Sequence, residues 1–229
     1  MERLRLAVVG GTGPQGRSLA YRFAVAGHHV VIGSRVAERA SRTAEEIQLR
    51  VPRSSVVGRT NNEAAADCPV ILLAVPYDGH ADVVTSLRDC LVGKVVISCV
   101  NPLSVDKTGA RAVRVPHGSA AEEAAALAPG SDVIAAFHHL SAAKLWRDDE
   151  SLAQEDVLVC GDSPTAKNLV MELASAVTGR PGVDAGPLRM AGVLESFTGV
   201  LININKRYKT RSGIAIVGLA DRSRQGPGA

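Results

Sequence analysis

Aromatic residues are scarce in this chain of 229 residues, where phenylalanine, tyrosine and tryptophan together make up 3% of the sequence. Proteins that bind single-stranded nucleic acid usually stack the bases on such side chains. The net charge of +3 is modest, and the basic residues are scattered apart from a cluster at Lys206, Arg207, Lys209 and Arg211. The composition therefore predicts no nucleic-acid partner and requires no polyanionic one.

Long apolar runs are also lacking. The run VILLAV at Val70 to Val75 is one of the longest, and it is far below the roughly 20 residues that a membrane-spanning helix needs. The four cysteines are widely spaced, form no C-x-x-C pair, and no signal peptide precedes the strand expected near Leu4. These features predict a reduced, cytoplasmic protein with no membrane partner.

Two groupings that carry chemistry in many enzymes are missing. None of the three tyrosines, Tyr21, Tyr77 and Tyr208, has a lysine four positions later, so the Tyr-x-x-x-Lys pair of short-chain dehydrogenases is not there. No nucleophile elbow and no evident Ser/His/Asp grouping occurs either. The sequence therefore predicts no catalytic acid, base or nucleophile, so that catalysis by this chain would depend on the positioning of its reactants.

What the sequence does contain is a glycine-rich turn in the segment LRLAVVGGTGPQG, residues 4–16. Gly11, Gly13 and Gly16 fit G-x-G-x-x-G, in which the first glycine allows a tight turn, the second admits a pyrophosphate and the third lets helix and strand pack closely. Pro14 suits the first position of the helix that follows. Helix N-terminal amides attract phosphate. The segment predicts a dinucleotide site, and the alternative is a purely structural turn.

Short apolar runs rich in β-branched residues alternate with helical patterns along the chain. The expected strands are residues 4–10, 29–35, 70–75, 94–100, 133–137 and 157–161. Apolar strands separated by helices predict an α/β fold with a doubly wound, mostly parallel sheet of the Rossmann type. We expect an NADP-binding domain over residues 1–140, a smaller α-rich C-terminal domain over 141–219 that closes the cleft, and a flexible tail over 220–229.

Local signals also mark individual helices. Ser119 and Glu122 form a capping-box pattern, and Ser163 before Pro164 predicts the start of another helix. The last long helix is expected at about residues 189–209, with an apolar stripe made of Met190, Val193, Leu194, Phe197, Leu201, Ile204 and Tyr208. This stripe either covers the sheet or meets a second subunit, and we expect a homodimer.

The residues after the second expected strand favour NADP over NAD. Proteins specific for NAD usually place an acidic residue there to hold the ribose 2′-hydroxyl, whereas this chain has Ser34 and Arg35, with Arg39 one helical turn further on. Guanidinium groups match phosphate oxygens, so these residues predict a 2′-phosphate site. The alternative is that both arginines are simply solvated at a helix start.

Ligands of such sheets bind outside the carboxyl ends of the strands. The residues placed there are Val75, Asn101 and the run from His138 to Ser141. Asn101 is expected to be a polar neighbour of the nicotinamide, because an amide does not serve as a base. Adjacent histidines point in different directions, so which of His138 and His139 faces the ligand stays open. No other ligand residue stands at metal-binding spacing from them, and no metal is expected.

Segments in the same order along residues 4–219 resemble the coenzyme F420-dependent NADP oxidoreductases, most closely their actinobacterial branch. They include GGTGPQG, IGSR with Arg39, AVPYDGHA, NPL at Asn101, AAFHHLSA at Ala135 and DAGPL at Asp184. The resemblance implies hydride exchange between C4 of NADP(H) and C5 of coenzyme F420, an 8-hydroxy-5-deazaflavin. The chain departs from the archaeal pattern at Tyr77, at Gly79 and at residues 139–141.

The resemblance also implies a set of cofactor-binding residues. The pyrophosphate is expected at the turn, on Gly11, Thr12, Gly13, Pro14, Gln15 and Gly16, and the 2′-phosphate on Ser34, Arg35 and Arg39. The nicotinamide is bordered by Val75, Asn101 and Pro102. The deazaflavin is lined by His138, His139, Leu140, Ser141 and Ala142, and closed in by Glu195 and Ser196.

Two other functions are compatible with the same nucleotide-binding half. One is an NADPH-dependent reductase of a different acceptor, such as a flavin or ferric iron. The other is a non-catalytic NADP sensor that changes partners with redox state, because a nucleotide-binding fold alone does not establish catalysis.

Overall fold

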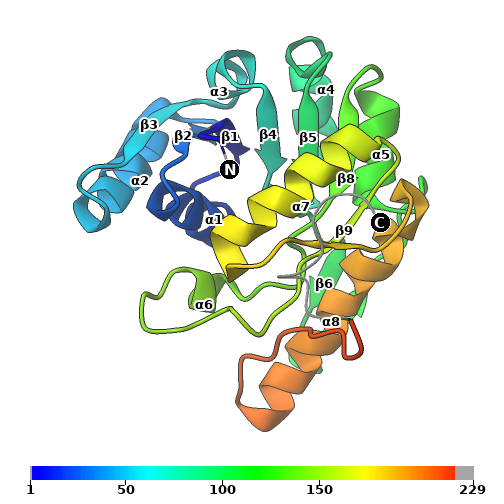
Figure 1. The fold of residues 1–229 in the computed structure, drawn as a ribbon. Coiled ribbons are helices and arrows are strands. Elements are labelled where there is room, and N and C mark those ends of the chain that lie inside the picture. The colour runs from blue at the N-terminus through cyan, green and yellow to red at the C-terminus, as the bar shows by residue number, and fades with distance from the viewer. Residues whose placement is uncertain (1, 220–229) are drawn as a thin grey trace.

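The computed structural model describes residues 2–219 and shows one eight-stranded sheet with helices on both faces (Figure 1). The strand order is β10-β9-β8-β5-β4-β1-β2-β3. All neighbouring pairs are parallel except β8 with β9, which run antiparallel. The predicted doubly wound, mostly parallel sheet is confirmed. No helix of residues 2–219 is long and apolar enough to cross a bilayer.

The six expected strands all form. They are β1 (Arg5–Val9), β2 (His29–Ser34), β4 (Val70–Leu73), β5 (Val95–Ser98), β8 (Asp132–Ala135) and β9 (Leu158–Gly161). Four strands were not expected, namely β3 (Ser55–Thr60), β6 (Leu103–Val105), β7 (Ala110–Ala112) and β10 (Val183–Asp184). These are short or half exposed, so they lack the continuous apolar run that marks a strand buried on both faces.

Each face of the sheet has its own apolar core. On one face Leu6 and Val8 pack with the helices α1 (Pro14–Val25), α2 (Ala37–Arg50), α6 (Ala142–Leu145) and α7 (Pro164–Thr178). On the other face Ala7 and Val9 pack with α3 (Asn61–Asp67), α4 (His80–Leu91), α5 (Ala120–Leu127) and the start of α8 (Ala191–Tyr208). Alternate residues of a strand point to opposite faces, so one strand serves both cores.

The helix-start signals are largely confirmed. Ser163 caps α7 by accepting a hydrogen bond from the Ala166 amide, and Pro164 is the first helical residue. Ser119 accepts from the Glu122 amide in the same way at α5. The Glu122 carboxylate, however, accepts from the Ser119 hydroxyl rather than from the Ser119 amide. The capping box at Ser119 is therefore only half formed.

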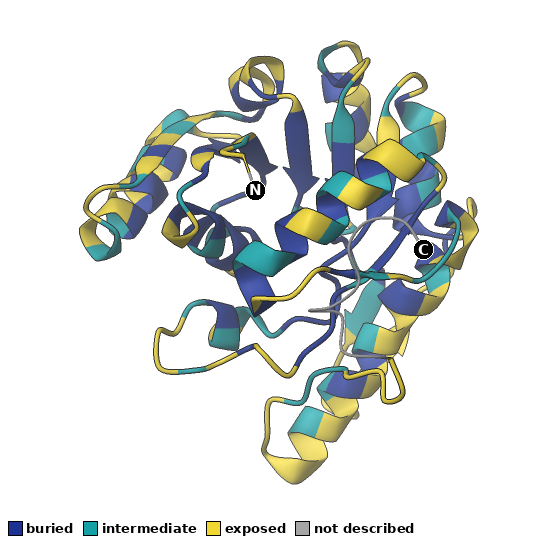
Figure 2. Ribbon diagram, in the orientation of Figure 1, coloured by how far each residue is buried: buried dark blue, intermediate teal, exposed yellow. Residues whose placement is uncertain are grey.

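The last helix contacts the protein over only part of its length. It begins at Ala191, where Ala191 and Leu194 pack against the second core. Further along, α8 leaves the sheet and carries mostly exposed residues (Figures 1 and 2). Asn203 holds it to β7, since its side-chain amide both accepts from the Ala110 amide and donates to the Ala110 carbonyl.

The chain after residue 140 is joined to the main sheet. It supplies β9, β10 and α7, which pack on β8 and the first core, before it continues into α8. The division into domains at residues 1–140 and 141–219 stays a prediction. The tail predicted over residues 220–229 lies outside the described residues.

Candidate cofactor-binding site

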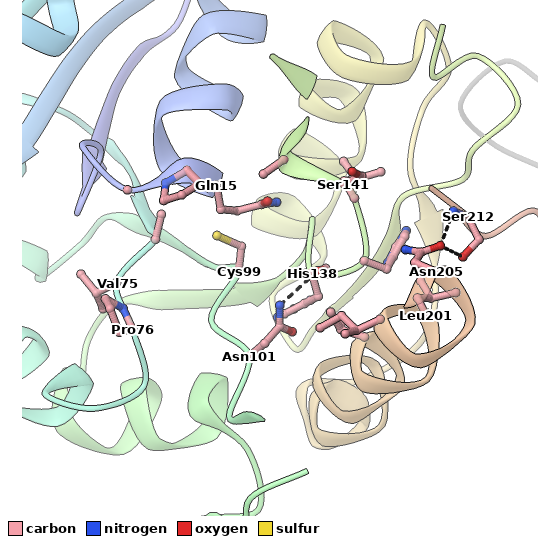
Figure 3. Close-up of a pocket in the computed structure, with 18 residues that line it drawn as sticks. Gln15, Val75, Pro76, Cys99, Asn101, His138, Ser141, Leu201, Asn205 and Ser212 are labelled. Atoms are coloured by element: carbon pink, nitrogen blue, oxygen red, sulfur yellow. Dashed lines mark hydrogen bonds between the residues drawn. The ribbon is translucent and has the colours of Figure 1, made fainter. Parts of the chain in front are cut away.

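Two cavities open at the carboxyl ends of β1, β4, β5 and β8, where the strand order reverses between β1 and β4. The first, the arginine cavity, measures about 430 Å³ and is lined by Gly10, Thr12, Gly13, Ser34, Arg35, Val36, Arg39, Asn61, Ala74, Val75, Pro76, Asp78, Gly79 and Val83. The second, the histidine cavity, also measures about 430 Å³ (Figure 3). Its walls come from α1, the loops after β4, β5 and β8, α8 and the segment after α8.

The glycine turn has the geometry that a phosphate site needs. Gly13 caps α1, no side chain occupies its cap position, and Pro14 begins the helix, as expected. A Cβ on Gly16 would lie 2.9 Å from the Gly10 carbonyl oxygen, so the third glycine is required for close packing. The left-handed φ of +74° belongs to Gly10, one residue earlier than the motif suggests, while Gly11 is required because a Cβ there would meet the Val8 carbonyl oxygen at 2.7 Å.

The end of β2 presents positive charge to the arginine cavity. Arg35 and Arg39 are exposed, and neither guanidinium forms a hydrogen bond or ion pair with any residue of the described chain. Ser34 is buried, and its hydroxyl oxygen accepts from the Val36 amide at 3.3 Å. The Ser34 hydroxyl hydrogen is therefore left for a ligand. Two unpaired guanidiniums and a hydroxyl donor fit a phosphate group.

Unpaired polar atoms lie in the wall of the histidine cavity. The Asn101 amide group donates to the His138 carbonyl oxygen at 3.1 Å, which leaves the buried Asn101 Oδ1 without a partner in residues 2–219. Both ring nitrogens of His138 are buried and likewise unpartnered within that range. Burial lowers the pKa of His138 to about 3, so its ring is neutral. Unsatisfied buried polar atoms are costly, and a bound ligand with polar edges would satisfy them.

A strained turn aims these groups at the cavity. Phe137, which follows β8, is fully buried and has a φ of +66°, a conformation that costs a non-glycine residue about 1 kcal/mol or more. Its carbonyl oxygen accepts a hydrogen bond from Gln15 Nε2 at 3.1 Å, which ties the turn to α1. His139 Nε2 donates to the Asp156 carbonyl oxygen at 2.6 Å. His139 is therefore anchored to the protein, while His138 keeps both nitrogens free.

The segment after His139 is fastened to α1 and α2. Arg22 Nε donates to the Leu145 carbonyl oxygen at 2.7 Å, and Arg50 Nη1 donates to the Trp146 carbonyl oxygen at 2.6 Å. The guanidiniums of Arg17 and Arg50 lie 4.2 and 4.4 Å from the centre of the Trp146 ring. These contacts, formed across about 100 residues of sequence, fix the wall that begins at Ser141.

The two cavities meet at a common wall. Gly13, Ala74, Val75 and Pro76 line both. The two cavities therefore adjoin at this wall, with Arg35 and Arg39 in one cavity and His138 with Asn101 in the other.

Comparison with known proteins agrees with this geometry. Residues 5–102 match the family described as NADP oxidoreductase, coenzyme F420-dependent. An F420-dependent NADP reductase of Methanothermobacter thermautotrophicus is 38% identical over 226 residues, which are 96% of this chain and 97% of that protein. This chain belongs to the F420-dependent NADP oxidoreductase family. The F420-dependent NADP reductase of Methanocaldococcus jannaschii is 34% identical, over 94% of this chain and 99% of the relative.

The fold is also that of a solved structure. A crystal structure assigned provisionally as an F420-dependent NADP reductase, from Arthrobacter sp. FB24, superposes with a TM-score of 0.78. It is 22% identical and covers 93% of this chain and 99% of the crystallised one. At this identity the likeness supports the fold.

Most of the residues predicted to bind cofactors lie around the two cavities of this family member. Those that line one or both cavities are Thr12, Gly13, Pro14, Gln15, Ser34, Arg35, Arg39, Val75, Asn101, His138, His139, Leu140, Ser141 and Ala142. Gly11 and Gly16 line neither cavity, but a side chain on either would collide with main-chain atoms at or next to the turn. Pro102 is buried outside both cavities, where its carbonyl oxygen accepts from the Val113 amide.

Glu195 and Ser196 are not brought into either cavity. Glu195 is 2% exposed, and its carboxylate oxygens accept from the amides of Ala120 and Ala121 at the start of α5, at 2.9 and 3.1 Å. Burial raises the pKa of Glu195 to about 7, despite these two hydrogen bonds. Ser196 is exposed. Glu195 thus fastens α8 to α5, which places the following turns of α8 beside the histidine cavity.

The resemblance placed the last helix at the deazaflavin through Glu195 and Ser196, but the residues of α8 and of the chain after it that do line the cavity were missed. Thr198, Leu201, Ile202, Asn205 and Ser212 line the histidine cavity. Thr198 and Leu201 are one turn apart, a spacing that predicts a shared helix face but not what that face covers. Asn61, whose Oδ1 accepts from the Gly10 amide at 3.3 Å, was also missed in the arginine cavity.

Proposed function

We propose that this chain transfers a hydride between NADP(H) and coenzyme F420. The observation that carries the proposal is the wall of Gly13, Ala74, Val75 and Pro76 shared by the two cavities. A hydride transfer requires the donor and acceptor carbons to approach within about 3–3.5 Å. Two cofactors that meet at one wall satisfy this requirement without a covalent intermediate.

The arginine cavity fits the adenosine phosphate end of NADP(H). The turn after β1 offers main-chain amides at the start of α1 to the pyrophosphate. Arg35, Arg39 and the Ser34 hydroxyl suit the 2′-phosphate, which would repel an acidic residue at the same place. This binding orients the nicotinamide end toward Val75 and the shared wall.

The histidine cavity fits a planar heterocycle with polar edges. Asn101 Oδ1 accepts a hydrogen bond from a ligand N–H, and the neutral His138 ring offers one donor and one acceptor. When bound, the deazaflavin supplies the chemistry, by taking or giving a hydride at C5. Apolar side chains such as Leu140 and Leu201 line the same cavity and suit the faces of such a heterocycle.

His138 and Cys99 in the histidine cavity position the ligand and do not carry protons. The pKa of His138 is about 3, and burial raises the pKa of the nearby Cys99 thiol to about 12. Neither group changes its protonation state near neutral pH. Activity therefore rests on orientation and proximity, in keeping with the prediction of no catalytic acid or base.

An absorbance assay tests the function. Purified protein mixed with NADPH and oxidised F420 is expected to bleach the visible deazaflavin absorbance, and the reverse reaction with NADP⁺ and reduced F420 is expected to restore it. Parallel reactions with a free flavin and with a ferric chelate serve as controls. Binding of NADPH without any F420 turnover, or turnover with the control acceptors alone, would overturn the proposal.

We propose in addition that a second copy of this chain covers the exposed face of α8. Val193, Phe197, Val200, Ile204 and Tyr208 lie on one stripe of the helix and are each at least 36% exposed. A run of large apolar side chains in contact with water is typical of a subunit interface. The same helix in a two-fold related copy presents the same stripe, so the surface is complementary to itself.

Analytical ultracentrifugation checks the dimer. The unmodified chain is expected to sediment as a dimer at micromolar concentration, and Phe197→Glu to sediment as a monomer, because a carboxylate in the centre of an apolar interface is left unpaired. Leu49→Glu is the matched control, since Leu49 is 83% exposed on α2 and lies outside α8. A monomeric unmodified chain, or a dimeric Phe197→Glu, contradicts the proposal.

A cytoplasmic location is also proposed. It is supported by the four free cysteines, three of which are buried in the described structure.

A further inference from the structure

The far wall of the histidine cavity is formed by a side-chain pair that the sequence does not mark. Asn205 lies near the end of α8, and Ser212 lies in the segment that follows the helix. Both line the cavity, on the side opposite Gln15 and Val75 (Figure 3). Lys209 ends α8 with a left-handed φ of +51°, which turns the chain so that residue 212 returns to residue 205.

The hydrogen bonds fix the orientation of the Asn205 amide. Its Oδ1 accepts from the Ser212 main-chain amide at 2.6 Å and from the Ser212 hydroxyl at 2.7 Å (Figure 3). A main-chain N–H can only donate, so the Asn205 atom facing it is the oxygen. The Asn205 NH₂ group therefore points elsewhere, and it has no hydrogen-bond partner among residues 2–219.

The segment after α8 is held at a second place as well. The Ile214 carbonyl oxygen accepts from the Asp156 amide at 2.7 Å, and the Ile216 amide donates to Asp156 Oδ2 at 2.7 Å. Asp156 is also the residue whose carbonyl oxygen holds His139. The segment of residues 209–216 is thus tied both to Asn205 and to the opposite wall of the same cavity.

The two asparagines of the cavity are oriented in opposite senses. Asn101 donates from its NH₂ group to the His138 carbonyl oxygen, and its side-chain oxygen has no partner among residues 2–219. Asn205 accepts through its side-chain oxygen from Ser212, and its NH₂ group has no partner in that range. Among residues 2–219 the cavity wall therefore holds an unpartnered acceptor after β5, the buried Asn101 Oδ1, and an unpartnered donor on α8, the Asn205 NH₂ group. A ligand that satisfies both carries an N–H on one edge and an oxygen acceptor on another.

We propose that Asn205 is a specificity-determining residue of the acceptor site. Its NH₂ group donates a hydrogen bond to a carbonyl or ionised hydroxyl oxygen on the rim of the bound heterocycle. The two hydrogen bonds from Ser212 to Asn205 Oδ1, called the clasp below, hold this donor and residues 209–216 in place. The inference rests on the proposed function, because it assigns the edge of the deazaflavin that faces α8. A heterocycle without an oxygen at that edge is selected against.

The variant Asn205→Asp tests the donor separately from the clasp. A carboxylate still accepts both hydrogen bonds from Ser212, but it has no hydrogen to donate, and it repels a ligand oxygen. Binding of F420 without NADPH, followed by deazaflavin fluorescence, is expected to weaken by about tenfold or more, the size of one lost hydrogen bond. The affinity for NADPH is expected to stay within twofold. Ser212→Ala, which keeps the main-chain donor, is expected to weaken F420 binding by about threefold.

Asn203→Asp provides the matched control. Asn203 lies two residues away on the same helix, and its amide also clasps main chain, at Ala110, but it lies outside the cavity. Its F420 affinity is expected to stay within twofold of the unmodified chain. Equal F420 affinities for Asn205→Asp and Asn203→Asp overturn the inference, as does a parallel loss of NADPH binding in Asn205→Asp, which would make the clasp purely structural.

The outcomes separate this inference from the proposed function. If the unmodified chain reduces F420 and Asn205→Asp binds it equally well, only the role of Asn205 is overturned. If the unmodified chain binds NADPH but neither binds nor reduces F420, the proposed function is overturned and the inference with it.

Discussion

The arginine cavity and the histidine cavity are built in different ways. The arginine cavity comes from residues 10–39, Asn61 and residues 74–83, all within the first 83 residues of the chain. The histidine cavity combines residues from α1, the loops after β4, β5 and β8, α8 and the segment beyond it, so that Gly13 and Ser212 face one space. The arginine cavity is formed by residues that lie close together in the sequence, and the histidine cavity by residues that lie far apart in it.

The two cavities also differ in the chemical groups that line them. Exposed guanidiniums and main-chain amides serve the first, and such groups bind phosphate wherever a strand, a glycine turn and a helix follow each other. Neutral groups serve the second, where the Asn101 amide donates to the carbonyl oxygen of His138, 37 residues away, and Asn205 accepts from Ser212, 7 residues further along the chain. The comparison predicts that changes at Arg35 and Arg39, which line only the arginine cavity, act on NADPH, and that changes in the distant walls act on the acceptor.

The largest effect is expected from Gly16→Val. A side chain at this position meets the Gly10 carbonyl oxygen and Gly11 Cα at 2.9 Å, so the turn shifts away from its phosphate-binding geometry. NADPH affinity is expected to fall on the order of 100-fold, and stability by about 1–3 kcal/mol. Calorimetry and urea unfolding measure the two quantities.

Gly13→Ala is the control for the effect of Gly16→Val on stability, because it adds a side chain to the same turn without a close contact. Its Cβ would meet the Gly10 carbonyl oxygen at an ordinary 3.5 Å, so stability should change by less than about 0.5 kcal/mol. A Gly16→Val protein with normal NADPH affinity would show that the turn is only structural.

Arg35→Glu is expected to have the next largest effect. Replacing a charge-assisted donor by a carboxylate removes one strong contact and adds repulsion, so the KM for NADPH should rise about 100-fold. The KM for NADH, which lacks the 2′-phosphate, should change by less than about threefold. Arg53→Glu makes the same change of charge at an exposed position beyond the end of α2. Equal losses with both nucleotides would refute a phosphate role for Arg35.

His138→Gln, in the histidine cavity, is expected to have a smaller effect, which is on the pH dependence of the free energy of unfolding. The pKa of His138 is about 3 in the folded chain, because burial disfavours the charged ring, against an ordinary value of 6.5. Between these values the unfolded chain binds more protons, so stability falls as pH drops below 6.5. At pH 5 the loss amounts to about 2 kcal/mol. Gln does not titrate and should remove this part of the pH dependence.

Urea unfolding at pH 7.5 and pH 5 measures the difference between the two proteins. Contributions from His28 and His139, two buried histidines whose pKa values are also lowered by burial, are common to both proteins and cancel. Identical losses of stability on acidification would show that His138 is charged or solvated in the folded state.

The sequence predicted the strands that are buried on both faces and missed those that are not. Val70–Leu73 is a continuous apolar run with all four residues buried, whereas in β3 exposed and buried residues alternate at the sheet edge. The helix predicted at residues 189–209 does form, starting at Ala191. What it packs against could not be predicted, because its two sides contact α5, β7 and the cavity through residues far away in sequence.

The role of Glu195 shows the same limit. The resemblance to the family implies that Glu195 lies near the deazaflavin, but its carboxylate turns to the start of α5 and is buried there. By contrast, Arg35 and Arg39 lie where the sequence placed them, since both follow directly from the end of β2.

By itself the sequence determined the phosphate-binding turn, the positive charge beyond β2 and the order of strands and helices, because each depends on residues that are close together in the sequence. Only the tertiary structure decided that Asn101 donates its NH₂ group to the His138 carbonyl oxygen, that His139 rather than His138 is held by Asp156, and which residues of α8 and of the segment after it line the acceptor side. Those features depend on hydrogen bonds between segments that meet only when the sheet has formed.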